Sequence, residues 1–357
     1  MPTALQIAQG RQVPLSMGLF MAIRTVTPLL SAFDARTSGD DKFLSLAVVS
    51  LPTSKFVNIG EGMSASEGRT ELREFSCSQI GGLIKAERES SRLWDRHHQA
   101  SGYTWFDLQT RLRIEADARH IERQMIQGFS NDAKGFPGAK DMTPFTTANV
   151  LALTAQSQAS EFKKSVINAA GSTANTASSV YSFVFGELES QLVIGNDTGS
   201  EMLQIGETRT QMLPPDSTKP DELLEFDLAL IRGYLGLSVN GFNQQIAGQA
   251  VPVQYAVRRL ANLTADNNCK LTDAMMDKLK RSHGSGRTPN LFAMSARSGE
   301  QLAASRAPVA INFNMGQSGD AQNATFTTYP APPDNWNGIP IVYPDCIGDT
   351  DAIEVAA

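Results

Sequence analysis

The sequence predicts an α+β fold, in which one long helix is combined with several sheets built from distant parts of the chain. Two observations indicate this fold class. Residues 104–127 contain neither glycine nor proline, and apolar side chains recur along them at helical spacing. Elsewhere, short apolar stretches alternate with glycine, proline and polar clusters, which is typical of strands joined by turns.

The composition is that of a globular chain with little surface charge. Of 357 residues, 41% are hydrophobic and 19% are charged, against about 25% charged in most soluble domains. This length allows two or three compact units of about 100–200 residues each. A chain that hides surface against its own copies fits this composition, as do many enzymes. A net charge of -6 argues against a protein that neutralises many phosphates.

The three cysteines, Cys77, Cys269 and Cys346, lie far apart and form neither a disulfide framework nor a CxxC pair. They predict a chain that folds in a reducing cytoplasm. The apolar window 13–23 is too short to span a bilayer and has no basic segment before it. The sequence therefore predicts neither export nor membrane insertion.

The long helix is predicted over residues 104–128. Thr104 and Asp107 have the spacing of a capping box, and Gly128 stands where a left-handed C-terminal residue belongs. At about 1.5 Å per residue the rod is about 36 Å long, which is unusual for an enzyme of this size. Ion pairs four residues apart are expected on its surface: Arg111–Glu115, Arg113–Asp117 and Glu115–Arg119.

Before the helix, the sequence predicts an arm and a hairpin. Residues 1–44 are interrupted by Pro14 and Pro28 and resemble an arm rather than a domain. Within residues 45–88, two extended stretches flank the glycine-rich tract 60–68, which predicts a hairpin with a polar tip. Because an isolated hairpin is marginally stable in water, a projecting one is expected to lie on a partner.

After the helix, shorter elements are expected. Residues 155–179 are rich in Ala, Ser and Asn and predict a surface insertion that contains a short helix at 161–170. Strands are expected at 180–193, 223–239, 251–263, 290–294 and 338–344, and helices at 271–280 and 298–305.

No motif in the sequence predicts a catalytic residue, a metal ion or a cofactor. The pair His97-His98 has no third ligand at the right spacing, and His120-x-Glu122 lacks the PCxxC that completes a deaminase signature. The glycine-rich run 284–288 lacks the spacing of a phosphate-binding loop. All four histidines, His97, His98, His120 and His283, are therefore expected to be structural.

Several motifs, in their order along the chain, carry a resemblance to a known family. They are Phe56–Gly62 with Ser64–Ser66, Gly128 with Phe136–Ala139, Val180–Glu187, Gly236–Val239 before Val257–Leu263, and Gly338–Ile341. With an arm, a hairpin and a long helix ahead of interleaved sheets, the chain resembles the major capsid proteins of tailed bacteriophages with the Hong Kong 97-type fold. The resemblance covers most of residues 45–355, and the tract 155–179 departs from it.

The resemblance implies a division of the chain into named parts. These are an N-terminal arm (1–44), an extended loop (45–88), a peripheral domain (89–264) with 104–128 as its spine helix, and an axial domain with a C-terminal strand and tail (265–357).

The resemblance also implies a function that is structural and not enzymatic. The chain would self-assemble into hexamers and pentamers of an icosahedral shell that encloses phage double-stranded DNA without sequence-specific binding. A separate scaffolding protein, a portal protein and a decoration protein are the implied partners. The implied location is the virion, with assembly in the cytoplasm of the host bacterium.

Contacts between neighbouring subunits are expected to be electrostatic. Charges on the hairpin would meet charges on a neighbour's long helix, namely Glu61, Arg69, Arg73 and Glu74 on the first and Arg119, Glu122 and Arg123 on the second.

Two alternatives remain open. One is an encapsulin-like shell that encloses cargo proteins, which the sequence does not separate from a phage shell. The other is a soluble hydrolase with a site drawn from His97, His98 and Asp107, although the chain carries no GxSxG nucleophile motif.

Overall fold

The structure, a computed structural model, divides the chain into two compact units that are each described separately. Unit 1 comprises Met1–Leu46, Leu72–Asp141 and Ser190–Ser238, and unit 2 comprises Ala47–Glu71, Met142–Glu189 and Val239–Ala357. The structure describes residues 27–38, 42–50, 52, 56–59, 61–62, 65–97, 104–147, 150–152, 165–186, 189–195, 202–214, 222–239, 241–243, 253–266, 268–284, 287–306, 309–312, 325–328 and 331–355. Sheets and helices are both prominent, so the predicted α+β class is confirmed.

Unit 1 is built on a six-stranded sheet whose central strand is β11. The strands are β1 (Ala35–Ser38), β8 (Ser190–Gly195), β11 (Leu224–Val239), β10 (Arg209–Leu213), β4 (Ser78–Glu87) and β9 (Gln204–Ile205). β4 pairs antiparallel with β11 along its whole length, from Glu87↔Phe226 to Ser78↔Leu235. The predicted strand at 223–239 is thus confirmed.

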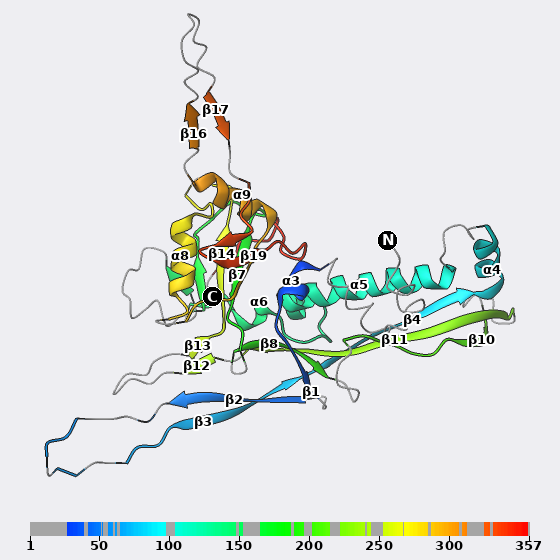
Figure 1. Ribbon diagram of the computed structural model, residues 1–357, viewed down its shortest axis with the longest axis horizontal. Helices are drawn as coiled ribbons and strands as arrows, with labels where there is room; N and C mark the ends of the chain where they lie inside the picture. The colour runs from blue at the N-terminus through cyan, green and yellow to red at the C-terminus, as the bar shows by residue number, and fades with distance from the viewer. Residues whose placement is uncertain are drawn as a thin grey trace, which may run out of the picture. The chain divides into compact units, whose positions relative to one another are not determined.

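The predicted long helix is α5 (Trp105–Gln127), which lies along β4 (Figure 1). Its capping box is present: Thr104 Oγ1 accepts from Asp107 N, and Asp107 Oδ2 accepts from Thr104 N. Gly128 ends the helix with φ 55° and ψ −131°, a positive φ but not the left-handed helical conformation that was expected. The apolar stripe of the helix is buried, and it comprises Ile114, Ala118, Ile121 and Met125.

Smaller helices complete unit 1 in its described part. They are α3 (Pro28–Ala32), α4 (Arg88–His97), the short 3₁₀ turn η2 (Gly128–Ser130) and α6 (Ala139–Met142). Two of the expected ion pairs on α5 are present, Arg113–Asp117 and Arg119–Glu115.

The predicted hairpin is formed by β2 (Lys42–Ser50) and β3 (Arg69–Ser76), which make a two-stranded sheet of their own. The sequence assigned all of residues 45–88 to this extended loop, and that range is too long. The chain leaves the hairpin at Cys77 and enters β4 of the six-stranded sheet, because alternate side chains there, Ile84 and Ala86, are apolar and become buried.

Unit 2 is built on a seven-stranded sheet of mixed direction. Its order is β18 (Asn335–Trp336), β19 (Ile339–Val342), β15 (Leu291–Ala293), β7 (Ser178–Phe183), β14 (Val257–Leu263), β6 (Val166–Asn168) and β5 (Val150–Ala152). Every residue of the two central strands β7 and β14 is buried. Two further hairpins belong to this unit: β12 (Gly241–Asn243) with β13 (Val253–Tyr255), and β16 (Val309–Asn312) with β17 (Thr325–Thr328).

Two helices complete the main core of unit 2, α8 (Asp273–Arg281) and α9 (Ala296–Ser305), seen beside the strands in Figure 1. Their apolar residues, among them Met276 and Leu302, join Leu260 and Phe292 of the sheet in one buried cluster. Arg259, the neighbour of Leu260 and therefore on the opposite face of β14, forms an ion pair of 2.5 Å with Glu354. Both faces of the central strands are therefore covered within the chain.

Two sequence predictions fail in this region. The tract 155–179 was expected to be a surface insertion with a helix at 161–170, but residues 166–168 form the strand β6 and are mostly buried. Val166 and Ile167 are β-branched and fit between β14 and β5, which overrides the polar composition around them. Residues 153–164 of the tract lie outside the described residues.

The expected strand at 180–193 is in fact two strands in different sheets. β7 ends at Phe183 in unit 2, and β8 begins at Ser190 in unit 1. The predicted domain boundary between residues 264 and 265 also falls inside one sheet, because β14 precedes it whereas β15 and β19 follow it. β7 and β8 are both apolar and lie close together in the sequence, so nothing in the sequence indicated that the chain passes from one sheet to the other between them.

Candidate functional site

The tip of the hairpin, residues 56–68, displays large apolar side chains. Phe56 and Ile59 are fully exposed, at 108% and 109% of their reference areas. Ile59 lies within a turn in which Glu61 N donates to Asn58 O at 3.0 Å and Asn58 N donates to Glu61 Oε2 at 3.1 Å. The carboxylate of Glu61 therefore stabilises the turn that presents the two apolar side chains.

The structure places the other predicted contact residues of the hairpin on β3. Glu74 is exposed there, and so is the apolar side chain of Leu72. Arg69 and Arg73 belong to the same strand, but their side chains lie outside the described part of the structure. Apolar as well as charged side chains thus face outward along the hairpin.

On α5, the predicted contact residues have different surroundings. Arg123 is exposed, and Arg119 is 59% exposed while it donates to Glu115 Oε1 at 2.8 Å. Glu122 was expected on the contact surface, and this prediction is wrong. Its side chain is 4% exposed, and Glu122 Oε1 accepts from Leu29 N in the first turn of α3 at 2.8 Å.

The burial of Glu122 has a simple helical reason. Residue 122 lies four positions after Ala118 and three before Met125, so it shares their buried stripe. Its carboxylate is satisfied there by Leu29 N of α3, since the first amides of a helix have no acceptor within their own helix.

One face of the six-stranded sheet, called the open face below, lacks a covering helix in the part of unit 1 that the structure describes. Leu83 of β4 and Leu230 of β11 are direct cross-strand partners on it, 54% and 48% exposed. Lys85 and Arg232 lie on the same face at the neighbouring register positions, and both are exposed. The open face is therefore an apolar pair flanked by positive charge.

The opposite face of this sheet packs against α5. Ile84 and Ala86 of β4 are buried on that face. Gly82 lies on it too, and a Cβ there would collide with the guanidinium of Arg113 from α5. Leu83 and Ile84 are adjacent apolar residues in one strand, so one must lie on each face. This was the sequence signal for an apolar open face, and the charge-based reading of the contacts missed it.

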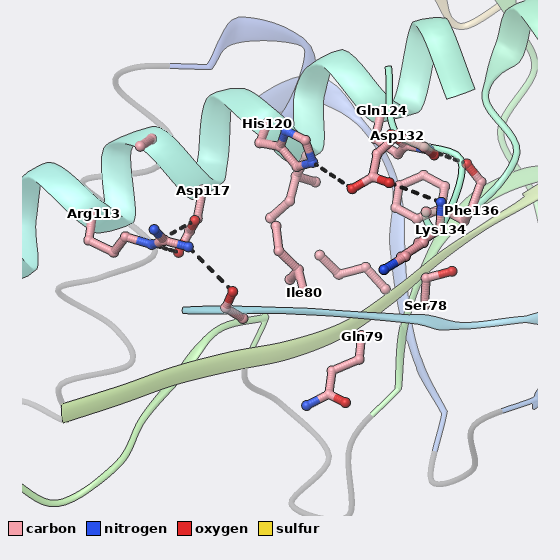
Figure 2. A pocket seen from close by; sticks show the side chains of 15 residues that line it. Ser78, Gln79, Ile80, Arg113, Asp117, His120, Gln124, Asp132, Lys134 and Phe136 are labelled. Carbon is pink, nitrogen blue, oxygen red and sulfur yellow. Dashed lines mark hydrogen bonds and ion pairs between the residues drawn. The ribbon is translucent and has the colours of Figure 1, made fainter. Parts of the chain in front are cut away.

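A groove of about 440 Å³ lies between α5, β4 and the turn 131–136 (Figure 2). At one end, Arg113 Nε is 3.1 Å from Asp117 Oδ1, and Arg113 Nη2 donates to Gly81 O at 3.3 Å. Burial raises the pKa of Asp117, and the charge of Arg113 opposes this rise. The arginine thus joins the helix to the strand beside a buried carboxylate.

At the other end of the groove, His120 Nε2 lies 3.7 Å from Asp132 Oδ2 (Figure 2). Gln124 Nε2 donates to Phe136 O at 2.7 Å and to Asp132 O at 3.2 Å. These contacts hold the turn 131–136 against α5. The groove is therefore a set of helix-to-strand and helix-to-turn contacts that fixes how α5 lies in unit 1.

The residues discussed as a hydrolase or metal site do not come together in the described structure. Asp107 caps α5, the side chain of His97 and all of His98 lie outside the described residues, and His283 is buried beside Ser182. Among the described residues, no group of three or more His, Cys, Asp or Glu side chains could hold a metal ion. Of the run 284–288, Arg287 forms an ion pair with Glu189.

No helix among the described residues is long and apolar enough to cross a membrane.

Comparison with known proteins finds similarity among solved structures only. No protein-family model matches the chain, and no curated protein matches it. The structure of bacteriophage Epsilon15 is 14% identical, with 89% of this chain and 87% of that chain covered and a TM-score of 0.43. The bacteriophage JBD30 capsid is 8% identical, with 90% and 91% covered and a TM-score of 0.43.

A third similar structure is the SrpI encapsulin complex from Synechococcus elongatus PCC 7942. It is 11% identical, with 68% of this chain and 89% of that chain covered and a TM-score of 0.40. The chain is thus similar to phage capsid structures, the class that the sequence motifs also resemble, and to an encapsulin.

Proposed function

We propose that this chain is a major capsid protein, a subunit that assembles with its own copies into an icosahedral shell around double-stranded DNA. The observation that carries the proposal is apolar surface left exposed at the hairpin tip and on one face of the six-stranded sheet. Phe56 and Ile59 project at the hairpin tip, and Leu83 and Leu230 pair on the open face. The role is structural, and no catalytic residue is assigned.

The energetic reason is the cost of leaving such surfaces in water. Full burial of a Leu, Ile or Phe side chain is worth about 1.5–3 kcal/mol, and a two-stranded hairpin alone is marginally stable. A second copy that covers these surfaces removes both penalties. The hairpin is therefore expected to be held in place by a neighbouring subunit.

Charge supports the pairing of these two surfaces. Glu61 and Glu67 are exposed on the hairpin tip, whereas Lys85 and Arg232 are exposed on the open face. Complementary potentials guide orientation and rate more than they add affinity. The apolar side chains therefore supply the contact energy in this proposal, and the charges set its register.

In such a contact the hairpin tip of one copy meets the open face of the next copy. The two copies contribute different surfaces, so the contact is heterologous. Heterologous contacts generate rings when the rotation between copies closes. Hexamers and pentamers of an icosahedral shell are rings of this kind. We therefore extend the proposal to those assemblies, with α5 as the spine helix of a peripheral domain and unit 2 as the part that contains the axial domain.

The wider assignment follows from this role. A separate scaffolding protein, a portal protein and a decoration protein are proposed partners. The net charge of -6 suits a wall that encloses DNA without binding it tightly. The proposed location is the virion, reached after assembly in the cytoplasm of the host bacterium.

Electron microscopy and sedimentation velocity of the purified chain, alone and with a candidate scaffolding protein, test the proposal. We expect uniform hollow particles tens of nanometres wide, or rings of subunits, and we expect removal of residues 60–70 to abolish them. The contents of particles made in cells distinguish a DNA shell from a cargo shell. A monomer or dimer under both conditions would refute the proposal.

The double substitution of Phe56→Ser and Ile59→Ser tests the hairpin tip itself. Assembly is expected to shift to higher subunit concentration by at least tenfold, because two apolar contacts are lost per interface. Phe129→Ser is the matched control, since Phe129 is 51% exposed in η2 and belongs to neither surface. Equal effects of tip and control substitutions would remove the hairpin tip from the interface.

A further inference from the structure

A buried histidine lies against the central strands of unit 2. His283 follows the end of α8 and has no exposed surface. Its Nε2 lies 2.6 Å from the hydroxyl of Ser182 on β7. Its other ring nitrogen, Nδ1, is buried and has no hydrogen-bond partner among the described residues.

The hydrogen bonds around Ser182 indicate which tautomer is present. Ser182 Oγ lies 3.4 Å from the backbone carbonyl of Arg258, to which its hydroxyl can donate. Ser182 Oγ then accepts from Nε2–H of His283, which leaves Nδ1 as the unprotonated nitrogen. A proton that arrives at this ring must therefore bind Nδ1, where it would form a buried N–H with no acceptor among the described residues.

The charge beside His283 is of the wrong sign for an imidazolium. Arg258, the cross-strand partner of Ser182, is fully buried on the same face of the sheet. Burial lowers the pKa of His283 well below its ordinary value, and the positive charge of Arg258 lowers it further.

Two cations in the last turn of α8 are engaged elsewhere. Lys280 lies over the ring of Trp336, and Arg281 pairs with Asp277. Glu354, on the other side of β14, pairs with Arg259. Among the described residues, Arg258 is the charged group that acts on the pKa of His283.

We propose that His283 is a proton-sensitive element of unit 2: it supports the packing of α8 on β7 and β14 only while it is neutral, so mild acid loosens unit 2 before unit 1. The proposal is independent of shell assembly.

The direction of the pH effect follows from linkage. In the unfolded chain His283 titrates near pH 6.5, whereas in the folded unit it resists protonation. The stability of unit 2 is complete above pH 6.5 and is lost as the pH falls below it. For one proton taken up on unfolding, the folding equilibrium of unit 2 weakens up to tenfold per pH unit.

Hydrogen exchange of the full-length chain, read by mass spectrometry between pH 7 and 5 and corrected for intrinsic exchange, tests the proposal. Protection in segments 178–183, 257–263 and 273–281 is expected to fall up to tenfold per pH unit below 6.5, while segment 224–237 of unit 1 changes little. His283→Gln is expected to flatten the response of unit 2. His120→Gln is the matched control and is expected to leave that response unchanged, since His120 lies in the groove of unit 1.

Nuclear magnetic resonance of ring-labelled histidine gives a second reading that needs no folded variant. The resonance of His283 is expected to keep the neutral Nε2–H form down to the pH at which unit 2 opens. Titration of a folded His283 near pH 6.5 would overturn the proposal, as would parallel loss of protection in both units.

Discussion

The two large sheets differ in how their faces are covered, and the difference separates what holds the chain together from what it offers to partners. In unit 2, every residue of β7 and β14 is buried, with helices on one face and the Arg259–Glu354 pair on the other. In unit 1, α5 covers one face, while Leu83 and Leu230 remain exposed on the other. Unit 2 completes its core within the chain, whereas unit 1 leaves apolar surface exposed, which the proposed assembly would cover with another copy.

The largest effect is expected from emptying the core of unit 2. Phe292 is fully buried and meets Trp336 edge to face, with ring centroids 5.9 Å apart. Phe292→Ala should lower the free energy of unfolding of unit 2 by about 3–5 kcal/mol. Chemical denaturation followed by segment-resolved hydrogen exchange measures this. Phe129→Ala, at an exposed phenylalanine, should change stability by less than about 0.5 kcal/mol; comparable losses would contradict the contrast between the units.

The next effect compares a buried ion pair with an exposed one. Arg259 is 3% exposed and Glu354 22% exposed, so Glu354→Gln leaves a buried guanidinium without its counter-charge and should cost about 3 kcal/mol. Glu115→Gln, which breaks the exposed pair with Arg119 on α5, should cost at most about 1 kcal/mol. Thermal unfolding at pH 7 and low salt distinguishes the two, and equal shifts would show that Arg259 is better solvated than its burial indicates.

A smaller effect is expected where α5 packs on β4. Gly82→Ala would push its Cβ into the guanidinium of Arg113, which must then release Asp117 or Gly81 O. The cost should be about 1–3 kcal/mol and should be confined to unit 1. Gly62→Ala is the control, because nothing lies within 4 Å of a Cβ at that position. A stable Gly82→Ala chain with unchanged protection of β4 would show that the Arg113 contacts are dispensable.

The smallest effect is expected for Asp117, whose contribution to stability changes with pH in the opposite direction to that of His283. Burial raises the pKa of Asp117 above its ordinary value. Its contribution to stability is therefore greatest below that ordinary value and is lost as the pH rises through the raised pKa. Asp117→Asn should flatten the pH dependence of unit 1 in this acid range, measured by denaturation between pH 4 and 7. Asp95→Asn, which changes an aspartate of α4, is the control; a steeper dependence in Asp117→Asn would reverse the assignment.

The sequence predicted the regular elements well where one local signal decided them. The capping box at Thr104 and Asp107 located α5, and apolar continuity located β11. It failed where a distant strand decided the outcome. β6 lies in a polar tract and is held by its neighbours β5 and β14, and no local pattern reveals such partners.

The contact residues show the same limit. Charges stand out in a sequence, so Glu122 was placed on a contact surface, although the stripe it shares with Ala118 and Met125 buries it. The adjacent apolar residues Leu83 and Ile84 indicated that one apolar side chain lies on each face of β4, but the pairing of Leu83 with Leu230 on the uncovered face followed only from the register of β4 on β11. Which face of a strand is left uncovered depends on tertiary packing, and so this part of the site could not be obtained from the sequence.

The exchange of strands between the two sheets has a consequence for synthesis on the ribosome. In unit 1, β11, which ends at Val239, pairs with both β4 and β8. The early strand β4 therefore cannot pair until this much later segment has been synthesised. Unit 2 needs β19 beside β15, and Glu354 for Arg259. Neither unit can complete its folding while the nascent chain is short, and newly made β4 and β7 would remain open to chaperones throughout much of translation.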